Sequence, residues 1–328
     1  MLEKSIAEHR ATEPKDSNGS SPRMSPLKRH GHVLPHEPLD VALVRHILAL
    51  AWALQPKRIG AFPKIIGMMI HHYLTPAVAR KLPDPERKRP GASGLCGVVG
   101  DTSVETMMEG MRKGLYAMGH VDPMKWWSPE ERCVLSFSDL KISETTARFL
   151  RSRRYRITFD ADPVGVLAGC AALHSKHQRQ TRIAPTMLRT ALDLFDAGHM
   201  HSVDIWDVDG ELVGGLYGYD VGTVFVHEGS FQTESHVSNI ALAVLAGHLA
   251  DWGFVLIDSK HMTDDYRALG YHNMPRRDLR VHLQKPAPKS AKRWWFDPSL
   301  NIGDWNPAEG PPKRKKSASD ITPDVITT

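Results

Sequence analysis

Cysteine is scarce in this sequence, and apolar runs of membrane-spanning length are missing from it. The three cysteines, Cys96, Cys133 and Cys170, are odd in number and include no C-x-x-C pair. That pattern excludes a disulfide framework and a zinc ribbon, and it favours reduced thiols in a cytoplasm. The first apolar stretch, 47–54, has eight residues, whereas a bilayer-spanning helix needs about 20. Because the first residues also lack a signal-peptide pattern, we expect a cytoplasmic protein without a membrane span.

Metal-ligand patterns are missing too, although the chain has 18 histidines. His199, His201, His227 and His261 fit neither H-E-x-x-H nor the Cys/His spacings of zinc sites. We therefore expect no metal ion, and the sequence indicates no other cofactor.

The composition that remains is that of a globular protein with a basic excess. Of the 328 residues, 41% are apolar and 24% are charged, and the formal net charge is +5. These values are typical of a soluble chain with two domains or so. A basic excess alone is a weak indication of nucleic-acid binding. Two end segments, 1–35 and 286–328, are rich in Pro, Ser, Lys and Arg, and we expect both to be disordered, apart from a docking patch at 294–296.

Between these ends, the sequence predicts a helical extension and two domains. Residues 36–89 form the extension and its linker, with apolar faces at helical spacing. We expect the extension to pack on the main body, the alternative being a helix that binds a membrane surface or a partner. Residues 90–140 are predicted to form a small N-terminal α/β domain, in which Ser103 caps a helix that carries a stripe of methionines. Residues 141–285 form the larger domain.

The larger domain alternates between helical and strand patterns. Asp209-Gly210 is a hairpin signal between two apolar strands, and Gly198 and Gly253 end two longer helices. The predicted order is helix 185–197, strands 202–206, 211–217 and 222–226, helix 237–249, strand 254–257 and helix 263–269. This order predicts an α+β fold with helices packed on a mostly antiparallel sheet.

Five short motifs occur along the chain, namely Trp126-Trp127-Ser128-Pro129, Gly198-His199-Met200-His201-Ser202, Leu212-Val213-Gly214-Gly215-Leu216-Tyr217-Gly218, Leu256-Ile257-Asp258 and Pro275-Arg276-Arg277-Asp278. In order and spacing, over residues 94–278, they resemble the leucyl/phenylalanyl-tRNA–protein transferase family. The resemblance implies an acetyltransferase-like (GNAT-like) mixed sheet in the larger domain. It also implies transfer of Leu, Phe or Met from aminoacyl-tRNA to the N-terminal Arg or Lys of an acceptor protein, which marks that protein for degradation.

The resemblance also implies roles for individual residues. Asp258, at the end of an apolar strand, corresponds to the family's catalytic aspartate, and Glu228 to a glutamate that contacts the amino-acid or adenosine end of the donor. Leu216, Phe225 and Ile257 correspond to the donor side-chain pocket. On the residues alone, Asp258 favours a site over a helix cap, Glu228 is as readily a surface ion pair, and the three apolar residues are typical of a core.

Two arginines, Arg276 and Arg277, follow a turn fixed by Pro275. Arginine forks bind phosphate well, so both are candidate tRNA contacts, although loop arginines are commonly only solvated.

Several positions around the expected site depart from the family pattern, four of them at candidate site residues. Lys260 replaces a glutamine, Arg182 and Met118 replace tryptophans, and His227 replaces a glycine. Because His227 and Arg182 add polar groups, we expect a donor that is polar or acidic rather than large and apolar. In an extended strand, residues i and i+2 lie on one side, so we expect Lys260 beside Asp258. There Lys260 either weakens the aspartate as a base or, when desolvated, accepts the proton itself.

Three functional hypotheses follow from the sequence. The first is a tRNA-dependent aminoacyl-transferase. The second is an acyl-CoA-dependent N-acyltransferase, which needs a Gly-rich backbone nest before a helix; residues 228–239 lack that pattern. The third is a non-catalytic tRNA-binding adaptor, which the substitutions Lys260 and Arg182 favour.

Overall fold

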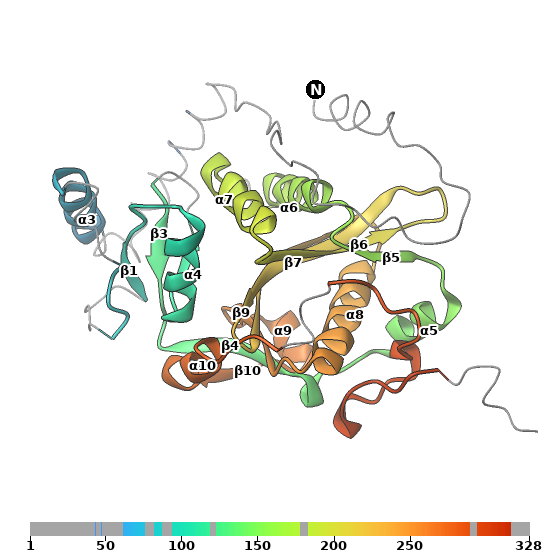
Figure 1. Cartoon of the computed structure of the whole chain (residues 1–328). Helices are drawn as coiled ribbons and strands as arrows, with labels where there is room; N and C mark the ends of the chain where they lie inside the picture. Colours follow the sequence, from blue (N-terminus) through green and yellow to red (C-terminus); the bar gives the residue numbers. More distant parts are fainter. Residues whose placement is uncertain are drawn as a thin grey trace, which may run out of the picture.

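The computed structural model describes residues 43, 47, 62–75, 82–86, 94–118, 123–177, 183–288 and 294–315. These residues build a small three-stranded sheet and a larger seven-stranded sheet, which lie side by side (Figure 1). Among the helices in these ranges, none combines the length and the apolar composition that a bilayer span requires.

The small sheet has the order β1-β3-β2 and is antiparallel. Its strands are β1 (Leu95–Val98), β2 (Tyr116–Met118) and β3 (Lys125–Trp127), and α4 (Val104–Arg112) packs against them. The Ser103 side chain accepts a hydrogen bond from the Thr106 amide at the start of α4, so the predicted cap is confirmed. The methionine stripe of α4 is buried. A further helix, α3 (Phe62–Leu74), lies outside β1 (Figure 1).

Replacing Gly110 by alanine is expected to destabilise the protein by about 1–3 kcal/mol, although alanine is the better helix former. A Cβ at Gly110 would lie 2.7 Å from Cη2 of Trp126, and the Trp126 ring is itself 1% exposed. The matched control is Gly67 of α3, where a Cβ would meet nothing within 4 Å. Gly67→Ala should therefore stabilise slightly. Denaturant unfolding compares the two variants, and a stabilised Gly110→Ala would contradict the expectation.

The larger sheet has the order β10-β4-β9-β8-β7-β6-β5. The β8–β9 pair is parallel and the other neighbours are antiparallel. The strands are β4 (Glu131–Ser136), β5 (Arg156–Phe159), β6 (Met200–Trp206), β7 (Leu212–Val221), β8 (Val224–Gln232), β9 (Leu256–Lys260) and β10 (His272–Pro275). The predicted meander is confirmed as β6, β7 and β8. The predicted boundary at residue 141 falls too late, because β4 already pairs with β9 and β10 of the larger sheet.

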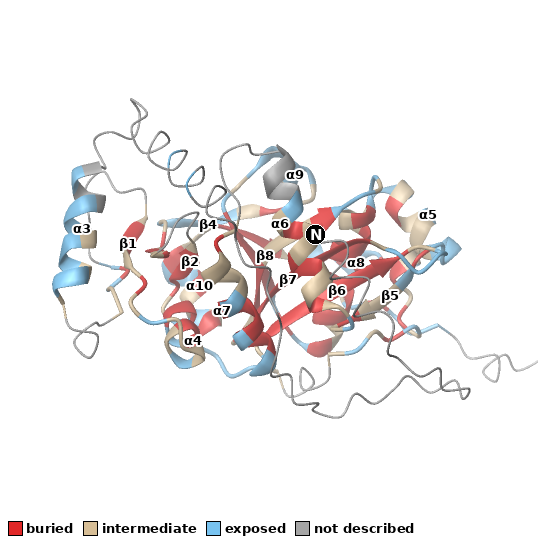
Figure 2. Ribbon diagram, turned by 90° about the horizontal axis from the view of Figure 1, so that it is seen from above, coloured by how far each residue is buried: buried red, intermediate tan, exposed pale blue. Residues whose placement is uncertain are grey.

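Helices cover both faces of the larger sheet (Figure 1). α6 and α7 pack on one face, and α8 packs on the other, so that two buried clusters flank the strands. Figure 2 shows that much of the larger sheet is buried. α8 is buried along almost its whole length and ends where Gly253 adopts a left-handed φ of 88°. The helices are α5 (Glu144–Ser152), α6 (Pro163–His177), α7 (Pro185–Asp196), α8 (Val237–Trp252), α9 (Asp264–Ala268) and α10 (Arg276–Leu283).

The expectation of disorder over 286–328 is wrong for residues 294–315, which we call the C-terminal strap. The strap packs beside α8 and α5, and Leu300, Ile302 and Trp305 are buried in the cluster around α8. The Asp297 amide donates to His248 Nε2 of α8 at 2.9 Å. The prediction failed because it rested on the average composition of the segment. The few large apolar residues are enough to fix the segment against α8. The segment 1–35, also predicted to be disordered, lies outside the described residues.

Candidate active site

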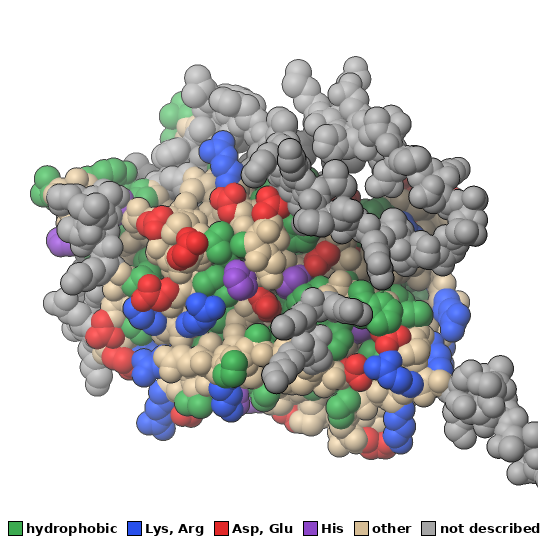
Figure 3. Space-filling view, in the orientation of Figure 1, with side chains coloured by type: hydrophobic (Ala, Val, Ile, Leu, Met, Phe, Trp, Pro, Cys, Tyr) green, Lys and Arg blue, Asp and Glu red, His purple; other side chains and the backbone are tan. Residues whose placement is uncertain are grey.

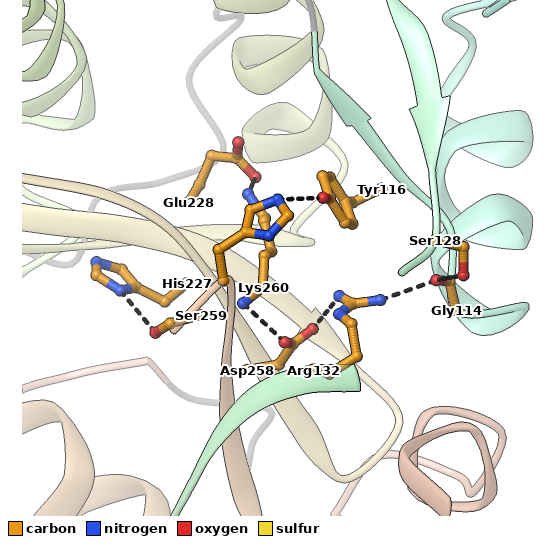
Figure 4. Close-up of polar contacts among 10 residues, drawn as sticks. Gly114, Tyr116, Ser128, Arg132, His227, Glu228, Asp258, Ser259 and Lys260 are labelled. Carbon is orange, nitrogen blue, oxygen red and sulfur yellow. Dashed lines mark hydrogen bonds and ion pairs between the residues drawn. The ribbon is translucent and has the colours of Figure 1, made fainter. Parts of the chain in front are cut away.

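The polar residues of the expected site converge where β8 and β9 meet the small sheet (Figure 4). Glu228 comes from β8, and Asp258 and Lys260 come from β9. Tyr116 of β2 and Arg132 of β4 lie among them. The structure thus joins residues from both sheets at one place.

Two β-bulges aim these side chains. β7 pairs Tyr217 with Gly229 but Gly218 with His227, so Glu228 is an extra residue in β8. β4 pairs Cys133 with Lys260 but Val134 with Asp258, so Ser259 is an extra residue in β9. An extra residue bends a strand and redirects its side chains, as often happens beside active sites.

Asp258 is held by Arg132 in the interior. Both side chains are almost completely buried and form a salt bridge. The second carboxylate oxygen, Oδ1, accepts a hydrogen bond from the Lys260 amide at 3.0 Å. Arg132 also donates to the Gly114 carbonyl at 2.8 Å, and its guanidinium lies 5.0 Å from the centre of the Tyr116 ring. Asp258 is therefore a fixed, fully paired carboxylate.

Sequence reasoning missed Arg132. The signal was present, because Arg132 opens the apolar run Cys133-Val134-Leu135 in a strand. A buried arginine in such a run needs a carboxylate partner, and Asp258 supplies it.

The prediction that the Lys260 side chain lies beside Asp258 is wrong. Its ammonium instead forms a salt bridge with Glu228, at 2.5 Å between Nζ and Oε2, and lies 5.4 Å from the centre of the Tyr116 ring. The rule for extended strands fails because Ser259 is the extra residue of the bulge and Lys260 has a left-handed φ of 67°. Lys260 thus neutralises Glu228, and Arg132 neutralises Asp258.

A small cavity lies beside Glu228, between the small sheet, α4 and α7. Glu228 is the one charged residue of its lining. The others are Met107, Met111, Met124, Met187, Tyr116, Ala117, Thr190, Tyr219 and Val226. The cavity measures about 10 Å³, which is room for about one water molecule.

Leu216, Phe225 and Ile257 lie on the other face of the sheet. Phe225 and Ile257 are paired across β8 and β9, and all three residues belong to the cluster under α8 with at most 1% exposure. Their side chains are core in this structure. Met118 is half-buried at the end of β2, and Arg182 lies outside the described residues.

His227 is buried on the side of β8 that faces α9. Its Nδ1 is 3.2 Å from Ser259 Oγ and 3.4 Å from the Tyr266 hydroxyl. Burial, with the Lys260 ammonium as a second cause, lowers the pKa of His227 from 6.5 to about 4. The imidazole is therefore neutral at physiological pH.

His227 is expected to make the protein sensitive to mild acid. In the unfolded chain, His227 becomes protonated near pH 6.5, whereas in the native protein it becomes protonated only near pH 4. The stability that this residue contributes is thus present at pH 7 and lost on acidification through that window, about 3 kcal/mol in all. Urea unfolding at pH 7 and pH 4.5 should show a smaller acid loss for His227→Gln than for the wild type. Equal acid losses would contradict the prediction.

Asp204 also titrates in this pH range, but it does not affect the comparison of acid losses between the two proteins. Burial raises the pKa of Asp204 to about 6, so its native form gains protons and its effect on stability has the opposite sign. Because Asp204 is present in both proteins, its contribution cancels in the difference.

The two candidate tRNA contacts have different surroundings. The Arg276 side chain is nearly buried, donates to the Ser128 carbonyl at 2.7 Å and forms an ion pair with Glu86 at 3.1 Å. The side chain joins α10 to the small sheet. In this conformation its guanidinium contacts protein groups and does not face a phosphate site. Arg277 is 81% exposed at the start of α10 and pairs with Asp278 at its side.

Comparison with known proteins extends the motif evidence. The profile described as leucyl/phenylalanyl-tRNA protein transferase matches residues 134–284. A leucyl/phenylalanyl-tRNA–protein transferase of Pseudomonas syringae pv. tomato is 39% identical over 191 residues, which cover 58% of this chain and 82% of that protein. One from Saccharophagus degradans is 34% identical over 248 residues, covering 74% and 98%. Among solved structures, FemX superposes with a TM-score of 0.38 at 7% identity, over 48% of this chain and 64% of FemX.

The sequence relatives decide the family, because two of them are more than 30% identical to this chain over most of their own length, 82% and 98%. The chain belongs to the leucyl/phenylalanyl-tRNA–protein transferase family.

Proposed function

We propose that this chain transfers an amino acid from an aminoacyl-tRNA to the N-terminal amine of an acceptor protein. The observation that carries the proposal is the convergence of Glu228 and Asp258, each with its cationic partner, beside Tyr116 of the small sheet, in a chain of this family. The larger domain is proposed to be GNAT-like and to begin at β4. A mixed sheet with one parallel pair inside antiparallel neighbours supports that assignment.

In this proposal, the donor lies across the β8 bulge. The amino-acid or adenosine end of the donor lies at Glu228, as the family pattern implies. Asp258 holds the Arg132 guanidinium beside Tyr116 and so fixes the charges around the position proposed for the incoming amine. A preorganised charge of this kind needs no rearrangement during the reaction.

Arg277 on α10 remains a candidate tRNA contact. Met118 on β2 and Arg182 remain candidate donor-binding residues. On the face shown in Figure 3, basic and acidic side chains are interspersed. Phosphate contacts on such a surface depend on individual cations, and each weakens as salt rises.

The donor is proposed to be smaller or more polar than Leu or Phe. His227 lies on the same side of β8 as Phe225, where the family pattern has a glycine, and both are buried. His227→Gly should clear this space and raise Leu or Phe transfer roughly tenfold, the usual effect of a few missing atoms in an apolar pocket. Transfer rates with Leu-tRNA and Phe-tRNA measure it. A variant that transfers both no faster than the wild type would remove His227 from the donor pocket.

The decisive experiment presents a pool of charged tRNAs to the purified full chain with peptides that begin with Arg or Lys. Mass spectrometry then identifies which residue is added to which peptide. We expect Asp258→Asn to lower the rate about 100-fold. The matched control is Asp264→Asn. The Asp264 side chain is fully exposed, so this variant should transfer the amino acid at the wild-type rate.

A non-catalytic adaptor is the second candidate. The observation that favours it is the buried salt bridge between Lys260 and Glu228, which occupies the carboxylate beside the cavity. An adaptor predicts tRNA binding without release of any amino acid from the pool.

A further inference from the structure

We propose that Tyr116 and His261 form a proton relay from the reaction space to solvent, a role that rests on the proposed transfer function. The Tyr116 hydroxyl is 2.6 Å from Nε2 of His261. The two rings meet edge to face, with their centres 5.8 Å apart. They come from different sheets, since Tyr116 lies in β2 and His261 directly follows β9.

Tyr116 supplies the inner end of the relay. It is 2% exposed and lines the cavity next to Glu228. Its ring contacts the Arg132 guanidinium and the Lys260 ammonium (Figure 4). Burial raises the pKa of the hydroxyl well above 10, so Tyr116 passes a proton on and does not remain as phenolate.

His261 supplies the outer end, because it is exposed at the surface. Four groups face it: the Tyr116 hydroxyl, the cations Arg132 and Lys260, and the Asp258 carboxylate. Burial of part of the ring and then the two cations lower the pKa of His261 below 6.5, and Asp258 opposes them. At neutral pH the imidazole is therefore free of the extra proton and ready to accept one.

The other candidate bases near Tyr116 are occupied. Asp258 is bonded by Arg132 and by the Lys260 amide, while Glu228 and Lys260 are bonded to each other. A proton transfer to any of them breaks a buried ion pair, which is costly. Transfer along the Tyr116–His261 bond leaves both pairs intact.

The relay balances as follows. The acceptor amine attacks the ester carbonyl carbon of the donor, a C–N bond forms, and the C–O bond to the terminal ribose breaks. The amine nitrogen gives its proton to the Tyr116 oxygen, while the Tyr116 hydroxyl proton moves to Nε2 of His261. The ribose oxygen takes a proton from solvent, and His261 returns its extra proton to solvent. No net charge accumulates in the cavity.

The test is single-turnover transfer as a function of pH, with the donor found in the pool. His261→Gln keeps a polar side chain, Tyr116→Phe removes only the hydroxyl, and His272→Gln on β10 is the matched control. We expect the wild-type rate to fall in acid with a midpoint below 6.5. His261→Gln and Tyr116→Phe should both transfer about 100-fold more slowly at pH 7, and their rates should no longer fall in acid. Binding of tRNA should be unchanged. Imidazole should rescue His261→Ala but not Tyr116→Phe.

The outcomes separate the relay from the function. Relay variants with the wild-type rate and pH profile would refute the relay and leave the transferase intact. Slow variants that keep the acid limb, with no imidazole rescue, would assign the pair a structural role and also refute it. A wild type that releases no amino acid from any tRNA would refute the proposed function and the relay together.

Discussion

Replacing Arg132 by methionine is expected to lower the free energy of unfolding by about 3–5 kcal/mol. The substitution leaves the Asp258 carboxylate in an interior where its side chain has no exposed area. The loss of a partner costs more than the pair itself contributes, because the remaining charge keeps its full desolvation penalty. Urea unfolding of the purified variant at pH 7 measures this loss.

Two further variants separate the charge effect from the loss of packing. Arg277→Met changes an arginine that is 81% exposed, so its stability should stay within about 0.5 kcal/mol of the wild type. The double variant Arg132→Met with Asp258→Asn removes the orphaned charge, and it should recover a large part of the loss. Strictly additive losses in the double variant would show that the two residues are not coupled.

Replacing Trp305 by alanine is expected to cost about 3–5 kcal/mol, the usual range for a buried tryptophan. Trp305 lies in the cluster under α8 with 9% exposure. Its indole donates to the Gly310 carbonyl at 2.7 Å, and its ring packs at Gly247 of α8. The C-terminal strap would lose its largest buried side chain and the turn that this hydrogen bond closes.

The chain offers a control of the same residue type in the strap. Trp295 is 51% exposed, and Trp295→Ala should leave the melting temperature nearly unchanged. Thermal unfolding of the two variants therefore compares equal changes in composition at buried and exposed positions. Similar melting temperatures for both would mean that the strap contributes little to stability.

Elements with a strong periodic pattern were predictable from the sequence. The helix at Val237–Trp252 and the meander of β6, β7 and β8 follow from apolar spacing and from the turn at Asp209-Gly210. These signals are local, and the packing around them agrees with the local preference.

The partners within the site were not predictable in the same way. Whether Lys260 faces Asp258 or Glu228 depends on one extra residue, Ser259, which sets the pairing with β4. A bulge is fixed by the register of neighbouring strands and leaves no periodic signal in its own strand. The burial of Arg276 likewise depends on Glu86, which is 190 residues away in sequence.

The C-terminal strap also has a consequence for the synthesis of the protein. Arg151 of α5 donates to the Gly303 carbonyl, a contact between residues 152 positions apart. On the ribosome, α5 and α8 emerge well before their covering segment. The apolar surface that receives Leu300, Ile302 and Trp305 therefore stays open until residues 294–315 have been translated. We expect nascent chains that stop before residue 294 to bind chaperones and to be cleaved readily by proteases, and chains that include the strap to lose both properties together.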